Sequence, residues 1–190
     1  MSQLISIAIW IFIPAGLANM APVIANKIPL LGVLNIPIDG GKTFRGRRIF
    51  GNNKTLRGFF AGFVFALFGI LLQRWLWRNA GAPCFQCGQD IDYSAQLMTT
   101  NIFLVATLYS VGALGGDVIE SFFKRQLGKK SGSAWFPFDQ VDYILGGLLL
   151  TWPVVRYSGA LALTIVAVFF VLHIISTIIG YGLGLKDAPI

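Results

Sequence analysis

The sequence predicts an all-α, polytopic membrane protein with about five transmembrane helices and two long basic loops. Hydrophobic residues make up 55% of the 190-residue chain and charged residues only 12%, with a mean hydropathy of +0.70. Several apolar runs also reach the roughly 20 residues that a helix needs to cross a bilayer core. The net charge of +7 comes from cations that gather between these runs, which is typical of membrane topology and argues against nucleic-acid binding. We therefore expect one integral membrane domain over residues 1–190.

Five apolar segments are the expected helices: residues 4–25, 56–76, 97–118, 141–156 and 159–182. The fourth is short, and Pro153 near its end predicts a kink or an early exit from the membrane. The first lies where a cleaved signal peptide would lie. It has no Lys or Arg ahead of its apolar stretch and contains two prolines and an asparagine, so a retained helix is favoured.

Lysines and arginines are distributed unevenly between the two sides of these helices. Seven lie between the first two helices and four between the third and the fourth, whereas three lie on the opposite side. By the positive-inside rule, this bias places the N-terminus outside and both basic loops, together with the C-terminus, in the cytoplasm. We therefore expect a multi-pass protein of the cell (plasma or inner) membrane.

The first basic loop has the composition of a phosphate-binding segment. Residues 39–58 read DGGKTFRGRRIFGNNKTLRG, in which six cations alternate with five glycines. Glycines let backbone amides turn toward an anion, and Lys and Arg supply charge and two-point hydrogen bonds to phosphate oxygens. A juxtamembrane polybasic loop that binds anionic lipid headgroups has the same composition. This loop alone leaves both interpretations open.

The end of the third helix adds acidic side chains to the cations. Charges of both signs at the end of a membrane span are costly unless they face a wet cavity or a ligand. If the helix continues to about residue 127, four polar residues recur at intervals of three and four and share one face. These residues are Asp117, Glu120, Ser121 and Lys124.

The start of the fourth helix carries a matching pair of carboxylates. Asp139 and Asp142 are three residues apart, so both side chains can point the same way, near a helix N-terminus that favours negative charge. Magnesium prefers one or two carboxylates plus substrate phosphates, so we predict a metal–phosphate site between the two helices. The structural alternative is that Asp139 caps its helix while Asp117 pairs with Lys124 or Arg125.

Three separated segments of the chain resemble CDP-archaeol synthases, small five-helix relatives of the CDP-diacylglycerol synthases. The segments are PAGLANMAPV (14–23), PIDGGKTFRGRRIFGNNKTLRG (37–58) and GDVIESFFKRQLG (116–128). The similarity to the CDP-diacylglycerol synthases themselves is weaker. Ser131 stands where those enzymes carry Asp, Gln140 stands where they carry Arg between two acids, and their His-Gly-Gly is missing.

The resemblance implies that CTP and a lipid phosphate of the archaetidic-acid type give a CDP-lipid and pyrophosphate. The lipid phosphate is already a nucleophile at neutral pH, so the reaction needs charge neutralisation and in-line positioning more than a strong base. The expected cofactor is Mg²⁺, and the expected partners are CTP, the lipid phosphate and the bilayer. Glycine pairs in the helices permit a homodimer without requiring one.

The resemblance also assigns roles to residues. The expected metal ligands are Asp117, Asp139 and Asp142, with Glu120 as a weaker candidate. Lys124 and Arg125 complete the catalytic group with these acids. The expected substrate-binding residues are Lys42, Arg45, Lys54, Thr55, Arg57, Ser121 and Lys130, and Asp39 is either a further ligand or the partner of a loop arginine.

Two other functions remain compatible with the residues. The lipid-facing side chains are generic Leu, Ile, Val and Phe, so a CTP:phosphatidate cytidylyltransferase is one alternative. The other is a noncatalytic membrane module that binds anionic lipids, which would need the cations and not the acids.

Several other features receive structural interpretations. Gly58 and Gly62, Gly112 and Gly116, and Gly180 and Gly184 are each four apart, which predicts close helix contacts. Cys84 and Cys87 form one CxxC pair, which cannot fill a zinc site, so it receives no catalytic role. His173 lies in the middle of an apolar helix, where a packing histidine is favoured over a proton relay.

Overall fold

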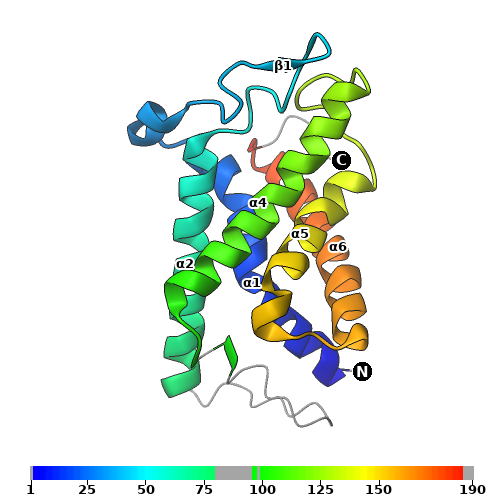
Figure 1. Ribbon diagram of the computed structural model, residues 1–190. Helices are drawn as coiled ribbons and strands as arrows, with labels where there is room; N and C mark the ends of the chain where they lie inside the picture. The colour runs from blue at the N-terminus through cyan, green and yellow to red at the C-terminus, as the bar shows by residue number, and fades with distance from the viewer. Residues whose placement is uncertain (1, 80–95, 98, 186–190) are drawn as a thin grey trace.

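The structure, a computed structural model, describes residues 2–79, 96–97 and 99–185. All five predicted helices are present (Figure 1), although the third begins five residues later than predicted and runs further. Cys84 and Cys87 lie outside the described residues. The elements are, in chain order, α1 (Ser2–Ala25), the 3₁₀ helix η1 (Pro29–Leu34), β1 (Thr43–Phe44), β2 (Arg47–Arg48), α2 (Leu56–Asn79), α4 (Ile102–Gln126), α5 (Phe138–Val155) and α6 (Gly159–Gly182).

The predicted class, an all-α polytopic membrane protein, is confirmed. Four helices (α1 from Gln3, α2, α4 and α6) are long and apolar enough to cross a membrane, and their outer faces expose large apolar side chains such as Phe68 and Leu163. The predicted count of five spans is not confirmed, because the 18-residue α5 is not among these four. As expected from Pro153, α5 ends soon afterwards, at Val155.

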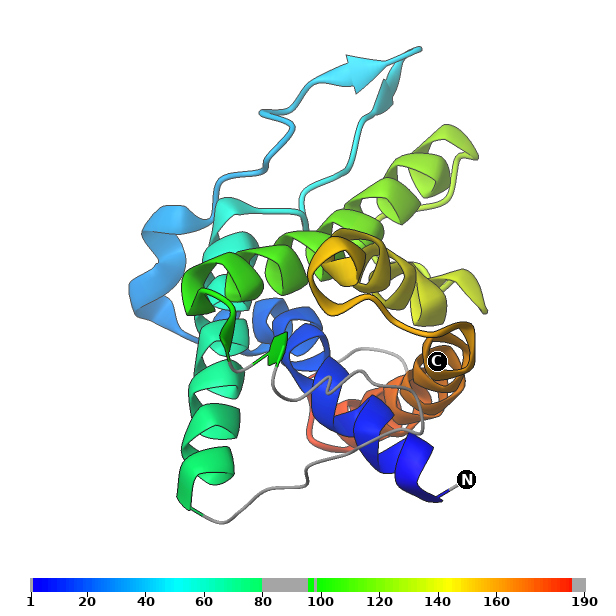
Figure 2. The same ribbon diagram turned by 60° about the horizontal axis from the view of Figure 1, so that its bottom comes forward.

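The core of the bundle forms around α1. Its inward side chains are almost completely buried, and the Phe12 ring packs edge-on against Tyr109 of α4 and Phe169 of α6, with centroid distances of 5.9 and 5.0 Å. Figure 2 shows α1 passing between the other helices. This central position supports the interpretation of the first apolar segment as a helix of the folded protein.

Helices α4 and α5 cross at glycines, as predicted for Gly112 and Gly116. A Cβ added to Gly116 would lie 2.1 Å from the backbone oxygen of Asp142, and one added to Gly112 would lie 2.6 Å from that of Gly146. Only glycine permits so close an approach of two backbones. The crossing therefore brings the last part of α4, from Asp117 onward, against the first turns of α5.

The other two glycine pairs have different outcomes. Gly58 faces α1, because its added Cβ atom would lie 3.4 Å from Pro22, and Gly62 lies between α1 and α4, because its added Cβ atom would lie 3.3 Å from the Ala18 backbone oxygen and 2.5 Å from the Leu114 side chain. The prediction for Gly184 was wrong. It adopts φ +66° just after the end of α6, where the backbone amides of residues 184 and 185 bond back to the carbonyls of residues 181 and 180. This pattern is a Schellman motif, so Gly184 terminates the helix.

Both basic loops lie at the same end of the bundle, and the N-terminus of α1 lies at the opposite end (Figure 1). The first loop contains two elements that the sequence did not predict, η1 and the β1–β2 hairpin, because neither is long enough to show a hydrophobic period. In the hairpin, Arg45 and Gly46 both have positive φ, as a type I′ turn requires. An antiparallel bridge between Pro37 and Thr55 closes the loop and holds its end at the start of α2.

Candidate active site

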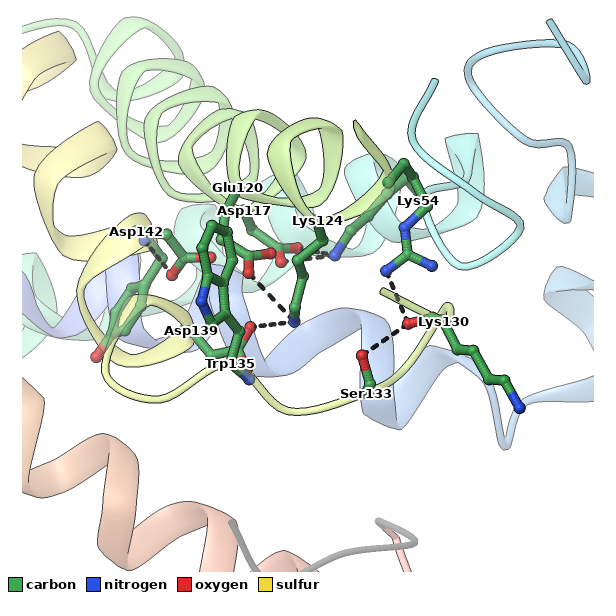
Figure 3. Close-up of polar contacts among 11 residues, drawn as sticks. Lys54, Asp117, Glu120, Lys124, Lys130, Ser133, Trp135, Asp139 and Asp142 are labelled. Atoms are coloured by element: carbon green, nitrogen blue, oxygen red, sulfur yellow. Dashed lines mark hydrogen bonds and ion pairs between the residues drawn. The ribbon is translucent and has the colours of Figure 1, made fainter. Parts of the chain in front are cut away.

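A cavity of about 540 Å³ opens at the end of the bundle that carries the basic loops. All five helices and both loops contribute to its wall, and its volume is typical of ligand sites. Figure 3 shows the charged side chains that meet there. The predicted site residues in the wall are Lys54, Thr55, Asp117, Ser121, Lys124, Arg125, Asp139 and Asp142.

The polar face of α4 forms one side of this cavity. The helix continues to Gln126, so the predicted face exists, and four polar residues from the last two turns line the cavity. They are only 6–8% exposed, although charged side chains are rarely buried unless they are paired or bind a ligand. These residues are Glu120, Ser121, Lys124 and Arg125.

Three carboxylates converge where α4 crosses α5. One oxygen each from Asp117, Glu120 and Asp142 lies within 4.8 Å of the others. The first two are three residues apart on one helix, and the glycine crossing supplies the third. Carboxylate oxygens are the ligands that Mg²⁺ prefers, so the donor set fits a divalent cation.

Asp139 lies beside this trio but has other partners. Its carboxylate accepts hydrogen bonds from Lys124 Nζ and from the Trp135 backbone amide, each 2.5 Å long, and Lys124 Nζ also lies 3.2 Å from Glu120. Pro137, and not Asp139, occupies the N-cap of α5. The role of Asp139 as a metal ligand therefore stays a prediction, while the geometry favours Glu120 as the third carboxylate.

Lys54 connects the first basic loop to the carboxylates. Its Nζ lies 2.6 Å from both carboxylate oxygens of Asp117, a partner that the sequence reasoning did not pair with it. Burial works to lower the pKa of Lys54, but the charge of Asp117 and the hydrogen bond to it outweigh burial and raise that pKa. Lys54 therefore remains an ammonium ion at neutral pH, next to the carboxylate trio.

The other predicted substrate-binding cations lie elsewhere. Among the described residues, the cavity wall does not include Lys42, Arg45, Arg57 or Lys130. Lys42 and Arg45 are exposed in or beside the hairpin, and Arg57 donates a hydrogen bond to the side chain of Asn26. Their roles as substrate ligands stay predictions, and geometry does not favour them.

Asp39 is the partner of a loop arginine, as one of its two predicted roles required. Its buried carboxylate lies 2.7 Å from Arg48 Nη2 and accepts hydrogen bonds from the backbone amides of Gly41, Phe50 and Gly51. Burial works to raise its pKa, but the hydrogen bonds from Arg48 and the amides lower it to about 2. We call this set of contacts around the Asp39 carboxylate the Asp39 hub. It shapes the loop so that Phe50 reaches the cavity wall.

We expect Asp39→Asn to loosen the loop without unfolding the bundle. A hydrogen bond to a charged group contributes about 1.5–3 kcal/mol, so trypsin cleavage after Arg47 should accelerate by about tenfold or more. In the wild type the pKa of Asp39 is lower in the folded loop than in the unfolded one, so the protection should be constant above about pH 4 and decline as the pH falls toward 2. Trypsin is inactive in this acid range, so the decline is measured by pepsin cleavage of the same loop. Arg48→Gln, which keeps the backbone contacts, should have a smaller effect. Cleavage of Asp39→Asn at the wild-type rate would contradict this role.

Sequence reasoning missed several uncharged residues of the wall. Phe50, Asn53, Gln140 and Thr177 line the cavity, and so does His173, for which the sequence favours a packing role. The centre of its ring lies 5.4 Å from the centre of the Tyr143 ring, so His173 both packs against Tyr143 and lines the cavity. The available signal was the spacing of four residues between His173 and Thr177 in an otherwise apolar helix, which places both on one face.

Comparison with known proteins identifies the family. The family described as "CarS-like: CDP-archaeol synthase" matches the chain over residues 1–190. The chain belongs to the CDP-archaeol synthase family. It is 39% identical over 160 residues to the CDP-archaeol synthase of Methanoculleus marisnigri, covering 80% of this chain and 89% of the relative. It is 30% identical over 193 residues to that of Halorubrum lacusprofundi, covering 98% of each.

A solved structure agrees with this family. It is described as an intramembrane enzyme for archaeal membrane lipids biosynthesis, and it matches with a TM-score of 0.68 and 28% identity over 90% of this chain and 92% of its own. Membership confirms the predicted enzyme class, which is CTP-dependent cytidylyl transfer to a lipid phosphate within the membrane. Membership therefore favours the enzyme over the alternative of a noncatalytic lipid-binding module.

Proposed function

We propose that the chain uses Mg²⁺ to transfer CMP from CTP to a lipid phosphate of the archaetidic-acid type. The observation that carries this proposal is the carboxylate trio of Asp117, Glu120 and Asp142 within a cavity that also holds Lys54 and Lys124. The ether-lipid substrate is supported by the relatives named CDP-archaeol synthase. The expected orientation, with this cavity facing the cytoplasm, is supported by the position of both basic loops at one end of the bundle.

The charges of the cavity support a divalent cation. The wall contains four carboxylates but only three cations among the described residues, namely Lys54, Lys124 and Arg125. These cations are already engaged or balanced by acids, so they cannot neutralise a triphosphate by themselves. When bound, Mg²⁺ would neutralise phosphate oxygens of CTP and the charge that develops on the pyrophosphate. Asp117, Glu120 and Asp142 would hold it.

The cations position the reacting phosphates. Lys124 is held by Asp139 and Glu120, and Lys54 is held by Asp117. Cations that are fixed in advance need little reorganisation when charge develops in the transition state. We therefore assign Lys54, Lys124 and Arg125 to the phosphates. The lipid phosphate acts as the nucleophile without a side-chain base, and the wall supplies apolar contacts from Val23, Phe59 and Leu114.

The test is CDP-lipid formation from labelled CTP by the purified protein in detergent, with unsaturated archaetidic acid and phosphatidate offered in parallel. We expect product from the ether lipid in the presence of Mg²⁺, no product with EDTA, and recovery when Mg²⁺ is added in excess. Product from phosphatidate alone would move the assignment to a CTP:phosphatidate cytidylyltransferase. Equal rates with and without EDTA would contradict the role of the carboxylate trio.

A further inference from the structure

The β1–β2 hairpin carries a separate cluster of cations outside the cavity. Lys42, Arg45 and Arg47 are all exposed, and residues 40–50 contain no acidic residue. Among the described residues, the one acid that contacts the hairpin segment through its side chain is Asp39, which binds Arg48. Lys42, Arg45 and Arg47 are therefore left without a carboxylate partner in the part of the chain that the structure describes.

The hairpin packs on the outward side of α4, near the end of that membrane-spanning helix. The Phe44 ring lies 6.0 Å from that of Phe122, and Arg47 donates a hydrogen bond to the backbone oxygen of Gln126. Figure 1 shows the hairpin beyond the end of the bundle, beside the last turns of α4. The cations of the hairpin thus lie next to the surface that α4 presents to lipid.

The adjoining face of α4 is apolar and exposed. Ile119, Phe123 and Leu127 follow at intervals of four residues and are 60%, 53% and 64% exposed, and Phe44 of the hairpin is 46% exposed. This apolar patch continues the outer face of a span that is long enough to cross the bilayer. Apolar residues of this kind, bordered by Lys and Arg, are typical of segments that lie in the headgroup region of a membrane.

We propose that this surface, formed by Lys42, Phe44, Arg45 and Arg47 with the exposed apolar residues Ile119, Phe123 and Leu127 at the end of α4, binds anionic headgroups of the surrounding bilayer. Phe44, Phe123 and Leu127 reach the acyl boundary, and the cations contact lipid phosphates. The Arg45 guanidinium lies 5.4 Å from the centre of the Phe44 ring, so charge and apolar surface are joined at the tip. The hairpin is connected through Asp39 to Phe50 in the cavity wall, so docking would hold one wall of the cavity.

The alternative ligand for the hairpin cations is the triphosphate of CTP, but the position of these cations disfavours it. Lys42 and Arg45 lie outside the cavity, whereas Lys54, Lys124 and Arg125 line it. Among the described residues, Lys42 and Arg45 also have no carboxylate partner of the kind that holds Lys54 and Lys124 in fixed positions. Exposed cations without such partners are suited to a diffuse surface of negative charge. The proposal does not depend on the lipid substrate or the metal assigned to the cavity.

The experiment places an environment-sensitive fluorophore at Leu127→Cys in a Cys84→Ser/Cys87→Ser background and reconstitutes the protein in vesicles. The vesicles contain phosphatidylcholine alone or mixed with phosphatidylglycerol. We expect the emission to shift to the blue when phosphatidylglycerol is present and to return at high salt. In Lys42→Gln/Arg45→Gln, the fraction of phosphatidylglycerol that gives half of the blue shift should rise by roughly 25-fold. Each surface cation strengthens binding to an anionic membrane by about fivefold, and this variant lacks two.

Lys27→Gln/Arg78→Gln is the matched control, since it removes the same charge from exposed positions away from the hairpin. It should respond as the wild type does. An identical response of the hairpin variant and the wild type, or no response to phosphatidylglycerol in either, would overturn the proposal. So would a hairpin variant that keeps the lipid response but has a higher KM for CTP, since its cations would then serve the nucleotide.

Discussion

Asp142→Asn is expected to reduce kcat/KM for CDP-lipid formation by about 10²- to 10³-fold, the usual cost of removing one preorganised electrostatic group. Asp142 completes the carboxylate trio with Asp117 and Glu120, and asparagine keeps its shape while removing its charge. The Mg²⁺ concentration that gives half-maximal rate should rise by at least about tenfold. Titration of the rate against Mg²⁺ at saturating CTP measures this shift directly.

Asp139→Asn is the matched comparison, because it removes the same charge three residues away on the same helix. In the wild type, the Asp139 carboxylate lies 2.5 Å from Lys124 Nζ and does not belong to the carboxylate trio. We expect a KM for CTP that is raised by about tenfold, from the loss of one charged hydrogen bond, with the Mg²⁺ dependence of the wild type. The opposite result, a shifted Mg²⁺ dependence in Asp139→Asn alone, would restore Asp139 as the ligand that the sequence predicted.

The helices and most charged residues of the site could be predicted from sequence because their signals are local. Apolar length predicts spans, and intervals of three and four residues place Asp117, Glu120 and Lys124 on one face of α4. The pairing of Lys54 with Asp117 could not be predicted, because 63 residues separate them and no local pattern encodes such a contact. The choice between Glu120 and Asp139 depends on how far α5 is rotated against α4, which only packing decides.

Composition also could not show that the cations of the first basic loop occupy two different places. Its six cations look alike in the sequence, yet Lys54 enters the cavity while Lys42 and Arg45 stay on the surface. The difference arises from the loop's folding, in which the Asp39 hub and the Pro37–Thr55 bridge direct its end toward α4. A polybasic loop and a phosphate-binding loop were therefore both reasonable interpretations, each fitting a different part of the same segment.

Gly116→Ala is expected to have the second large effect, although it changes no charged group. The added Cβ would lie 2.1 Å from the Asp142 backbone oxygen and 2.7 Å from its carbonyl carbon, and a backbone cannot rotate away as a flexible side chain can. The two helices must therefore separate by roughly 1 Å in a tightly packed interior. Since a misplacement of about 1 Å can cost about 10²-fold in rate, we expect a loss of that order in kcat/KM.

Overpacking should also lower the stability of Gly116→Ala by about 1–3 kcal/mol, measured as a decrease in Tm in detergent. Gly115→Ala is the control, because a Cβ added there meets nothing within 4 Å among the described atoms outside its own helix, and alanine is the stronger helix former. It should keep wild-type activity and an equal or higher Tm. If the two variants behave alike, the α4–α5 contact at glycine does not set the position of Asp142. If only Gly116→Ala loses activity, the close crossing that brings Asp142 to Asp117 is itself a requirement of the active site.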